Sequence, residues 1–166
     1  MIEVSDTALK TAAEEGMDEF IRVFTDKYQE GMGGEITAAT MPLLTGEQHS
    51  LLAYQIFRDE IMIGGFCQLI QNGYGSYIFD NPFAKAMRLW GFDEFSKLIY
   101  RAKKLYDVNR EDLEKERTDE EFMAMYEAYE AFDDLEEEFF QMEEDLTQRI
   151  AMYVDQNLEL FAKIKN

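Results

Sequence analysis

The sequence predicts an all-α fold, arranged as a single-domain bundle of roughly six to eight helices with a long C-terminal helix. Apolar residues recur at intervals of three and four along almost the whole chain, which is the period of an amphipathic helix. No clear run of alternating β-branched residues indicates a strand, and only two prolines interrupt the pattern. With 166 residues, 46% of them hydrophobic, the chain can bury one substantial core. We therefore expect residues 1–166 to form one domain.

Two helix starts are predicted in the N-terminal third of the chain. Ser5 or Thr7 can cap a first helix, which we expect to end near Gly31. Thr45 and Gln48 have the spacing of a capping box, in which each side chain accepts a hydrogen bond from the other residue's backbone amide. A second helix is therefore expected to begin there.

Four glycines interrupt the most apolar stretch of the sequence. Gly64 and Gly65 fall where a helix of nearly twenty residues should turn, because glycine accepts a positive φ and lets another backbone approach closely. Asn72 and Gly73 provide a second stop, which leaves residues 66–71 as a short helix between two corners. A phosphate-binding loop is not indicated, because no strand precedes the glycines and no Lys-Ser/Thr pair follows them. We interpret these glycines as architectural.

The C-terminal half contains further helix signals. Pro82 suits the first position of a helix, where the missing amide hydrogen costs nothing. Thr118 and Glu121 form a second predicted capping box. From about Asp134, one apolar stripe continues as far as Ile164, so we expect the last helix to occupy nearly all the remaining chain.

Negative charge is concentrated in one part of the chain. The sequence has 35 acidic and 16 basic residues, a net charge of −19, which disfavours nucleic acid or an anionic membrane as a direct partner and favours a basic protein. Residues 111–145 hold 17 of the acids and two bases, a net charge of −15. In a helix, that density is one acid per about 3.1 Å of rise, close to the roughly 3.4 Å between phosphates along one DNA strand.

The candidate partner-binding residues are the acids on the two helices predicted within this window. They are Asp119, Glu120, Glu121, Glu127, Glu130, Asp133, Asp134, Glu136, Glu137, Glu138, Glu143, Glu144 and Asp145. Two alternatives remain open: the acids form a solvated surface that only keeps the protein soluble, or the bases of residues 81–110 neutralise them, within one chain or across a homodimer. The methionines and tyrosines beside these acids also fit a homodimer contact.

A set of residues around the paired glycines carries a recognisable motif. The set comprises Tyr54, Glu60, Gly64, Gly65, Phe66, Gln68, Asn72 and Gly75. Together with residues 153–161, it resembles the DNA mimic protein family over about residues 45–163. Ile63 stands where the family motif has Asn.

Members of that family are small bacterial all-helical proteins, mostly of unknown function, and the name comes from an acidic member that imitates DNA and occupies a DNA-binding regulator. The resemblance therefore implies an all-helical fold. It also implies a basic, DNA-binding regulatory protein as the partner.

An enzyme is not favoured by the residue patterns. His49 is the only histidine and Gly46, three positions earlier, is not a glutamate, so neither a di-iron pair nor a two-histidine zinc helix fits. Neither an EF-hand loop nor a nucleophile elbow appears. We predict no catalytic residue, cofactor or metal. A small-molecule or catalytic pocket at the Gly64–Gly75 corner, with Glu60 as its acid, remains an alternative.

The sequence also predicts where the protein acts. Cys67, the single cysteine, cannot form an internal disulfide, which suits a reducing compartment. The N-terminus lacks the basic start and apolar run of a signal peptide, and no window approaches the roughly 18 apolar residues of a membrane span. We therefore expect a cytoplasmic protein with no membrane contact.

Overall fold

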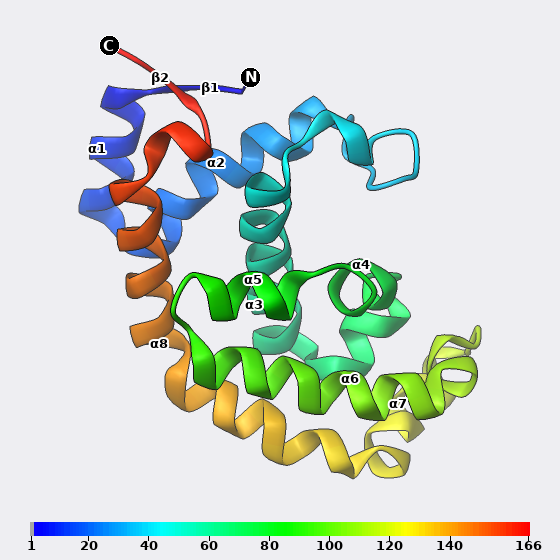
Figure 1. The fold of residues 1–166 in the computed structure, drawn as a ribbon. Coiled ribbons are helices and arrows are strands. Elements are labelled where there is room, and N and C mark those ends of the chain that lie inside the picture. Colours follow the sequence, from blue (N-terminus) through cyan, green and yellow to red (C-terminus); the bar gives the residue numbers. More distant parts are fainter. Residues whose placement is uncertain (1) are drawn as a thin grey trace. The chain divides into compact units, whose positions relative to one another are not determined.

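A computed structural model describes residues 2–166 of the protein (Figure 1). The chain is 78% helical, with eight α-helices and one sheet of only two strands among the described residues, which confirms the all-α prediction. In the same residues, no helix is both long enough and apolar enough to cross a bilayer. The chain divides into two compact units, residues 2–55 with 144–166 and residues 56–143, and each is described by itself. A single domain over residues 1–166 stays a prediction.

The first unit contains both described ends of the chain. Its elements are β1 (Glu3–Ser5), α1 (Asp6–Glu15), α2 (Met17–Gly31), the 3-10 turn η1 (Met41–Leu43), the start of α3 (Gly46–Gln71), the end of α8 (Asp133–Gln156), η3 (Leu158–Leu160) and β2 (Lys163–Lys165). Ser5 caps α1 by accepting a hydrogen bond from the amide of Ala8. The predicted capping box at α3 is also present, because the Thr45 amide donates to Gln48 at 2.9 Å and the Gln48 amide donates to Thr45 at 3.2 Å.

The last helix is shorter than predicted, because the chain leaves α8 at Gln156 and ends as a strand. β2 pairs in parallel with β1, and Ile164 lies opposite the buried Val4. The apolar residue at position 164 therefore packs from a strand rather than from the helix stripe that was expected. A strand of three residues is too short to show an alternating pattern in the sequence.

Buried polar contacts hold the first unit together. The Tyr28 hydroxyl and the Gln48 amide group both donate to the carbonyl oxygen of Phe161, at 2.7 and 3.0 Å. The hydroxyls of Tyr54 and Thr147 lie 2.6 Å apart and are both buried. Because a buried polar group costs free energy unless it is bonded, these contacts fix how α2, α3, α8 and the C-terminal turn pack. Tyr54 of the motif is thus a core residue of this unit.

The second unit is helical throughout its described length. It comprises the end of α3, α4 (Gly75–Phe79), α5 (Phe83–Leu89), α6 (Asp93–Glu114), α7 (Asp119–Ala128), the 3-10 turn η2 (Glu130–Phe132) and the start of α8. Phe57 lies at the centre of its core, with ring centroids 5.6 Å from Phe66, 5.2 Å from Phe95 and 5.0 Å from Phe139. α5 packs on α6, where the Ser96 hydroxyl donates to the carbonyl oxygen of Ala84 at 2.6 Å (Figure 1).

The predicted helix starts of the second unit differ in how they are built. The capping box of α7 is present, because the Thr118 amide donates to Glu121 at 3.1 Å and the Glu121 amide donates to Thr118 at 3.2 Å. Pro82 precedes α5 as its N-cap residue instead of occupying its first position. The prediction was therefore one residue early at α5.

Candidate partner-binding surface

The candidate acidic residues of the second unit lie on α7, on η2 and on the first half of α8. Three of them, Asp119, Glu120 and Glu121, form the first turn of α7, and Asp133 and Asp134 begin α8. Free backbone amides at a helix N-terminus favour negative charge, so these carboxylates also stabilise their own helices. Acidic residues at these positions therefore both stabilise the helix starts and add to the negative charge of the surface.

The structure separates the thirteen candidate side chains into exposed and half-buried ones. Eleven are exposed, whereas Glu136 and Glu143 are half-buried. Glu143 accepts a hydrogen bond from the Arg58 guanidinium at 2.5 Å. Glu144 and Asp145 belong to the first unit, and Asp145 pairs with Arg149 at 2.8 Å.

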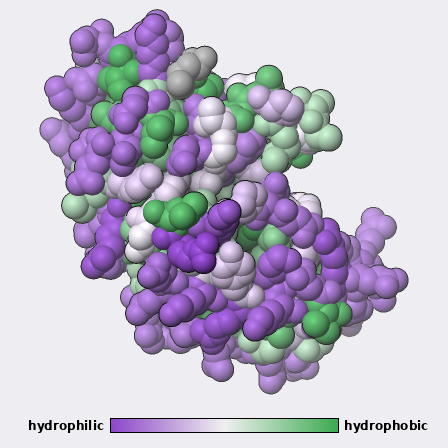
Figure 2. Space-filling view, viewed as in Figure 1, coloured by the Kyte–Doolittle hydropathy of each residue, from purple (hydrophilic) through white to green (hydrophobic). Residues whose placement is uncertain are grey.

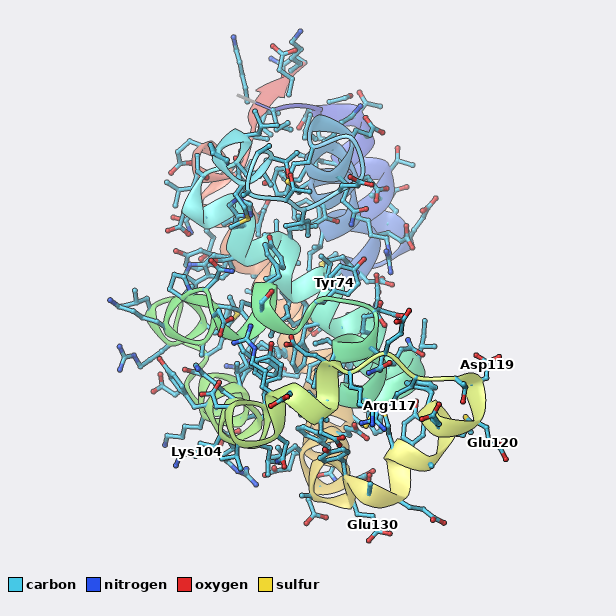
Figure 3. All side chains as sticks on the ribbon, turned by 90° about the vertical axis from the view of Figure 1, so that its right-hand side faces the viewer. Tyr74, Lys104, Arg117, Asp119, Glu120 and Glu130 are labelled. Atoms are coloured by element: carbon cyan, nitrogen blue, oxygen red, sulfur yellow. The ribbon has the colours of Figure 1, made fainter. Side chains whose placement is uncertain are left out.

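Within the second unit, six of the exposed candidate carboxylates form no salt bridge and no side-chain hydrogen bond to any residue of 2–166. These unpaired carboxylates are Asp119, Glu120, Glu127, Glu130, Asp133 and Asp134. Figure 3 shows the side chains of Asp119, Glu120 and Glu130 pointing away from the ribbon of the second unit. Such carboxylates remain hydrated, and a cation from another molecule can approach them directly.

The basic segment preceding the acidic window neutralises little of it. Arg101 pairs with Glu138 at 2.7 Å, and Arg110 pairs with Glu114 at 3.2 Å and with Asp80 at 2.8 Å. Among residues 2–166, the pairs Arg101–Glu138 and Arg110–Glu114 are the only salt bridges from the bases of residues 81–110 to the acids of 111–145. Figure 3 shows Lys104 on α6, on the opposite side of this unit from Asp119.

Arg117, which sequence reasoning missed, is nearly buried beside the start of α7. Its side chain is 11% exposed, and its guanidinium bonds to the carboxylate of Asp112 at 3.0 Å. The Tyr129 hydroxyl donates to the same carboxylate, and this bond chiefly lowers the pKa of Asp112. The Asp112 carboxylate therefore links α6 to Arg117, which precedes α7, and to Tyr129, which follows it. The only sequence signal was a lone arginine within an acidic run.

The Gly64–Gly65 corner is held by side chains from α7 and α8. Gly65 has a φ of 74° and a ψ of −169°, a conformation that only glycine adopts readily. The Tyr126 hydroxyl donates to the carbonyl oxygen of Gly64 at 2.8 Å, and the amide of Phe66 donates to the Glu136 carboxylate at 2.8 Å. A Cβ on Gly65 would lie 2.3 Å from an oxygen of Glu136.

The half-buried carboxylate of Glu136 therefore stabilises the corner by its hydrogen bond from the Phe66 amide. Burial raises the pKa of its carboxyl group, and the hydrogen bond from the Phe66 amide partly opposes that change. Its neighbour Glu137 is exposed. Within one helix, adjacent glutamates thus have different surroundings.

The remaining polar residues of the motif bind one another. One carboxylate oxygen of Glu60 accepts hydrogen bonds from the side-chain amides of Gln68, at 2.7 Å, and Asn72, at 3.0 Å. A Cβ on Gly64 would lie 2.1 Å from Gln68, and one on Gly75 would lie 2.8 Å from the Tyr106 ring. Protein atoms therefore fill this corner, which supports an architectural role for the motif.

Three further observations concern possible chemical sites. Burial raises the pKa of the Cys67 thiol to about 11, so the thiolate is disfavoured. Two surface hollows, of about 610 and 560 Å³, are lined by other residues than Glu60, Gln68 and Asn72. Across residues 2–166, no group of three or more His, Cys, Asp or Glu side chains is arranged to hold a metal ion.

Fold and surface together define an acidic, all-helical protein with unpaired carboxylates on α7 and at the start of α8. Residues 42–157 match the family described as DMP19-like protein, and the chain belongs to this family. It is 29% identical, over 126 residues, to DNA mimic protein DMP19 of Neisseria meningitidis serogroup B, a match that covers 75% of this chain and 76% of that relative. The family resemblance predicted from the motif is thereby confirmed.

Proposed function

We propose that the protein is an acidic protein-binding module that imitates DNA and occupies the basic surface of a DNA-binding regulatory protein. The unpaired carboxylates of α7, η2 and α8 are the observation that carries this proposal. Membership of the DMP19-like family supports it, as does the name of the meningococcal relative. The motif at the corner has a structural part in it, because Glu136 and Tyr126 hold α7 and α8 to α3.

The chemistry of the proposed contact is that of phosphate recognition. Lys and Arg side chains that bind phosphates can bind carboxylates in the same manner, and guanidinium groups form paired hydrogen bonds with both. Binding releases counterions from both surfaces, so the affinity falls steeply as salt rises. Unpaired carboxylates contribute most, because no intramolecular cation has to be displaced first.

Affinity capture with matched variants tests this function. The six-site variant neutralises the unpaired carboxylates by Asp119→Asn, Glu120→Gln, Glu127→Gln, Glu130→Gln, Asp133→Asn and Asp134→Asn. The control variant neutralises six exposed acids of the first unit that also lack salt bridges in residues 2–166, namely Glu14, Glu15, Asp26, Glu35, Asp155 and Glu159. Both variants lose the same charge, so any difference between them reports position.

Each immobilised protein is exposed to a bacterial lysate at about 50 mM and about 500 mM salt, and retained proteins are identified by mass spectrometry. The wild type and the control variant are expected to retain more of the basic DNA-binding proteins at low salt than at high salt, whereas the six-site variant retains few of them at either salt. Equal retention by all three proteins, or retention of non-basic companions regardless of salt, contradicts the proposal. Loss of solubility in both variants with unchanged retention supports the alternative of a merely solubilising surface.

A further inference from the structure

Large apolar side chains are exposed beside the Gly64–Gly65 corner. Ile63 of α3 is 79% exposed and Met62 is 44% exposed, while Phe140 of α8 is 43% exposed. Single exposed apolar residues are ordinary on a protein surface, whereas large contiguous apolar patches mark sites of interaction. Figure 2 shows a mostly hydrophilic face on the second unit, so apolar groups are sparse on the side in view.

Two hydrogen bonds place these side chains together. The carboxylate of Glu136 accepts from the Phe66 amide, and that of Glu143 accepts from Arg58. The later residue of α8, Glu143, therefore contacts the earlier residue of α3, Arg58, so the two helices run antiparallel here. Phe140 and Met62 lie between the two contacts.

Helical spacing completes the placement. Phe140 is one turn beyond Glu136 and Met62 is one turn beyond Arg58, so each lies on the helix face that meets the other helix. Ile63 is next to Met62 on the outer side of α3. We call Met62, Ile63 and Phe140 the apolar patch.

Acidic residues lie next to the apolar patch on both helices. Asp59, which pairs with Arg58 at 3.7 Å, precedes Ile63 by one turn of α3. Asp133 and Glu137 are exposed and lie one turn apart on α8. Residues 56–143 contain 21 acidic and 10 basic residues, so this unit is strongly negative. A second copy of the same surface would bring two such rims together and be repelled. A cationic partner with its own apolar side chains fits both parts of the surface.

We propose that the apolar patch docks a cationic amphipathic helix of the partner protein, with apolar side chains seated on Met62, Ile63 and Phe140 and with Lys or Arg contacting the acidic rim. This inference rests on the proposed function, because it takes the partner to be a basic protein. Carboxylates alone attract any cation, whereas a buried apolar centre selects among them. The patch therefore supplies selectivity and binding that survives high salt.

Labelled synthetic helices of about 18 residues test the docking by fluorescence anisotropy. The first peptide has Leu at i, i+3, i+4 and i+7 with Lys elsewhere; the second has the same composition with its Leu residues spread around the helix; the third has the same Lys count without Leu. The test variants are Ile63→Asn and Phe140→Ser. Leu89→Asn is the matched control, because Leu89 is 70% exposed on α5, which packs on α6.

We expect the amphipathic peptide to bind the wild type about tenfold more tightly than the shuffled one at about 500 mM salt. Ile63→Asn and Phe140→Ser each remove most of that preference, leave binding of the Lys-only peptide at low salt unchanged, and preserve the circular dichroism spectrum. Leu89→Asn behaves like the wild type. The inference is overturned if Ile63→Asn retains the preference, or if Leu89→Asn loses it equally.

The six-site variant separates this inference from the proposed function. If that variant binds the Lys-only peptide as tightly as the wild type, the proposed function fails. If it loses that binding while Ile63→Asn keeps the preference for the amphipathic peptide, the docking inference alone fails. A wild-type dimer in size-exclusion chromatography that becomes a monomer with Ile63→Asn also overturns the inference, because a second copy then covers the patch.

Discussion

Carboxylates occur both at the Gly64–Gly65 corner and along α7, η2 and the start of α8, yet they have different partners in the two regions. At the corner, Glu60 accepts hydrogen bonds from Gln68 and Asn72, and Glu136 accepts one from the Phe66 amide. Along the acidic segment, six carboxylates are exposed and unpaired among residues 2–166. The same functional group therefore stabilises the fold where the protein supplies donors, and is available to a partner where it does not.

Adjacent residues of α8 show how small a change separates these roles. Glu136 faces the corner and is half-buried, whereas Glu137 is exposed. Successive residues of a helix point about 100° apart, so one step along the chain moves a side chain from the core to the surface. Variants at the corner should therefore affect stability, and variants on the acidic segment should affect binding.

Gly65→Ala should give the largest loss of stability, about 3 kcal/mol in the free energy of unfolding. The new Cβ would meet the Glu136 carboxylate, and the backbone conformation is one that alanine avoids. Gly73 is the control, because its φ of 90° is also positive but nothing lies within 4 Å of a Cβ there. Urea unfolding should show a loss of only about 1 kcal/mol for Gly73→Ala. Equal losses for both variants would show that the clash with Glu136 does not contribute to the effect of Gly65→Ala.

Glu60→Ala should cost about 2 kcal/mol, because it leaves the amides of Gln68 and Asn72 without their acceptor. Glu130→Ala on the acidic segment should change stability by less than about 0.5 kcal/mol, since Glu130 is exposed and forms no salt bridge in the described residues. Thermal and urea unfolding of both variants measure the difference. A comparable loss for Glu130→Ala would show that the acidic segment also holds the fold together.

Glu136 should give the protein a pH dependence with a defined sign. Because burial raises its pKa above the usual 4.5, the folded protein keeps this proton at pH values where the unfolded chain has lost it. The stability that this group contributes is complete below pH 4.5 and falls as the pH rises through the raised pKa. Glu136→Gln cannot ionise, so the wild type should lose stability relative to this variant as the pH rises above 4.5.

Glu121 provides the opposite case for the same measurement. The hydrogen bond from the Thr118 amide chiefly lowers its pKa, so its stabilising contribution is present above pH 4.5 and is lost as the pH falls through the lowered pKa. Stability differences for Glu121→Gln and Glu136→Gln should therefore change with pH in opposite directions. Carboxyl titration by NMR should place Glu136 above and Glu121 below 4.5. A common direction would contradict the assigned surroundings.

The pair formed by Arg101 and Glu138 should have the smallest effect. Their side chains are 53% and 46% exposed, and exposed ion pairs contribute about 0 to 1 kcal/mol. A double-mutant cycle with Arg101→Gln and Glu138→Gln should give a coupling energy of about 0.5 kcal/mol that decreases with salt. Stronger coupling would mean that the basic segment competes with an external partner for the acidic window.

Local signals in the sequence predicted much of the fold. The boxes at Thr45 and Thr118 and the glycine corner at Gly64 could be identified because each depends on residues close together in the chain. The β1 and β2 pair could not, because it joins residues about 160 positions apart through strands of three residues each. Parallel pairing of such short, distant strands leaves no periodic pattern.

The composition of the acidic segment was predictable, but the environment of each acid was not. Burial of Glu136 and Glu143 depends on where α3 passes α8, since Phe66 and Arg58 supply their donors. Arg117 was missed for a different reason, because its pairing with Asp112 depends on how the chain turns after α6 ends at Glu114. Charge density can be read from a sequence, whereas pairing requires the tertiary fold.

Competition with DNA tests the central claim most directly. A DNA-binding protein captured on this protein is bound to its labelled duplex, and displacement of the duplex is followed by fluorescence anisotropy as the wild type or the six-site variant is added. We predict that the wild type displaces the duplex, that the control variant does so about equally, and that the six-site variant requires at least about tenfold higher concentration. A ternary complex with the duplex still bound, or equal displacement by the six-site variant, would contradict the proposal that these carboxylates take the place of DNA.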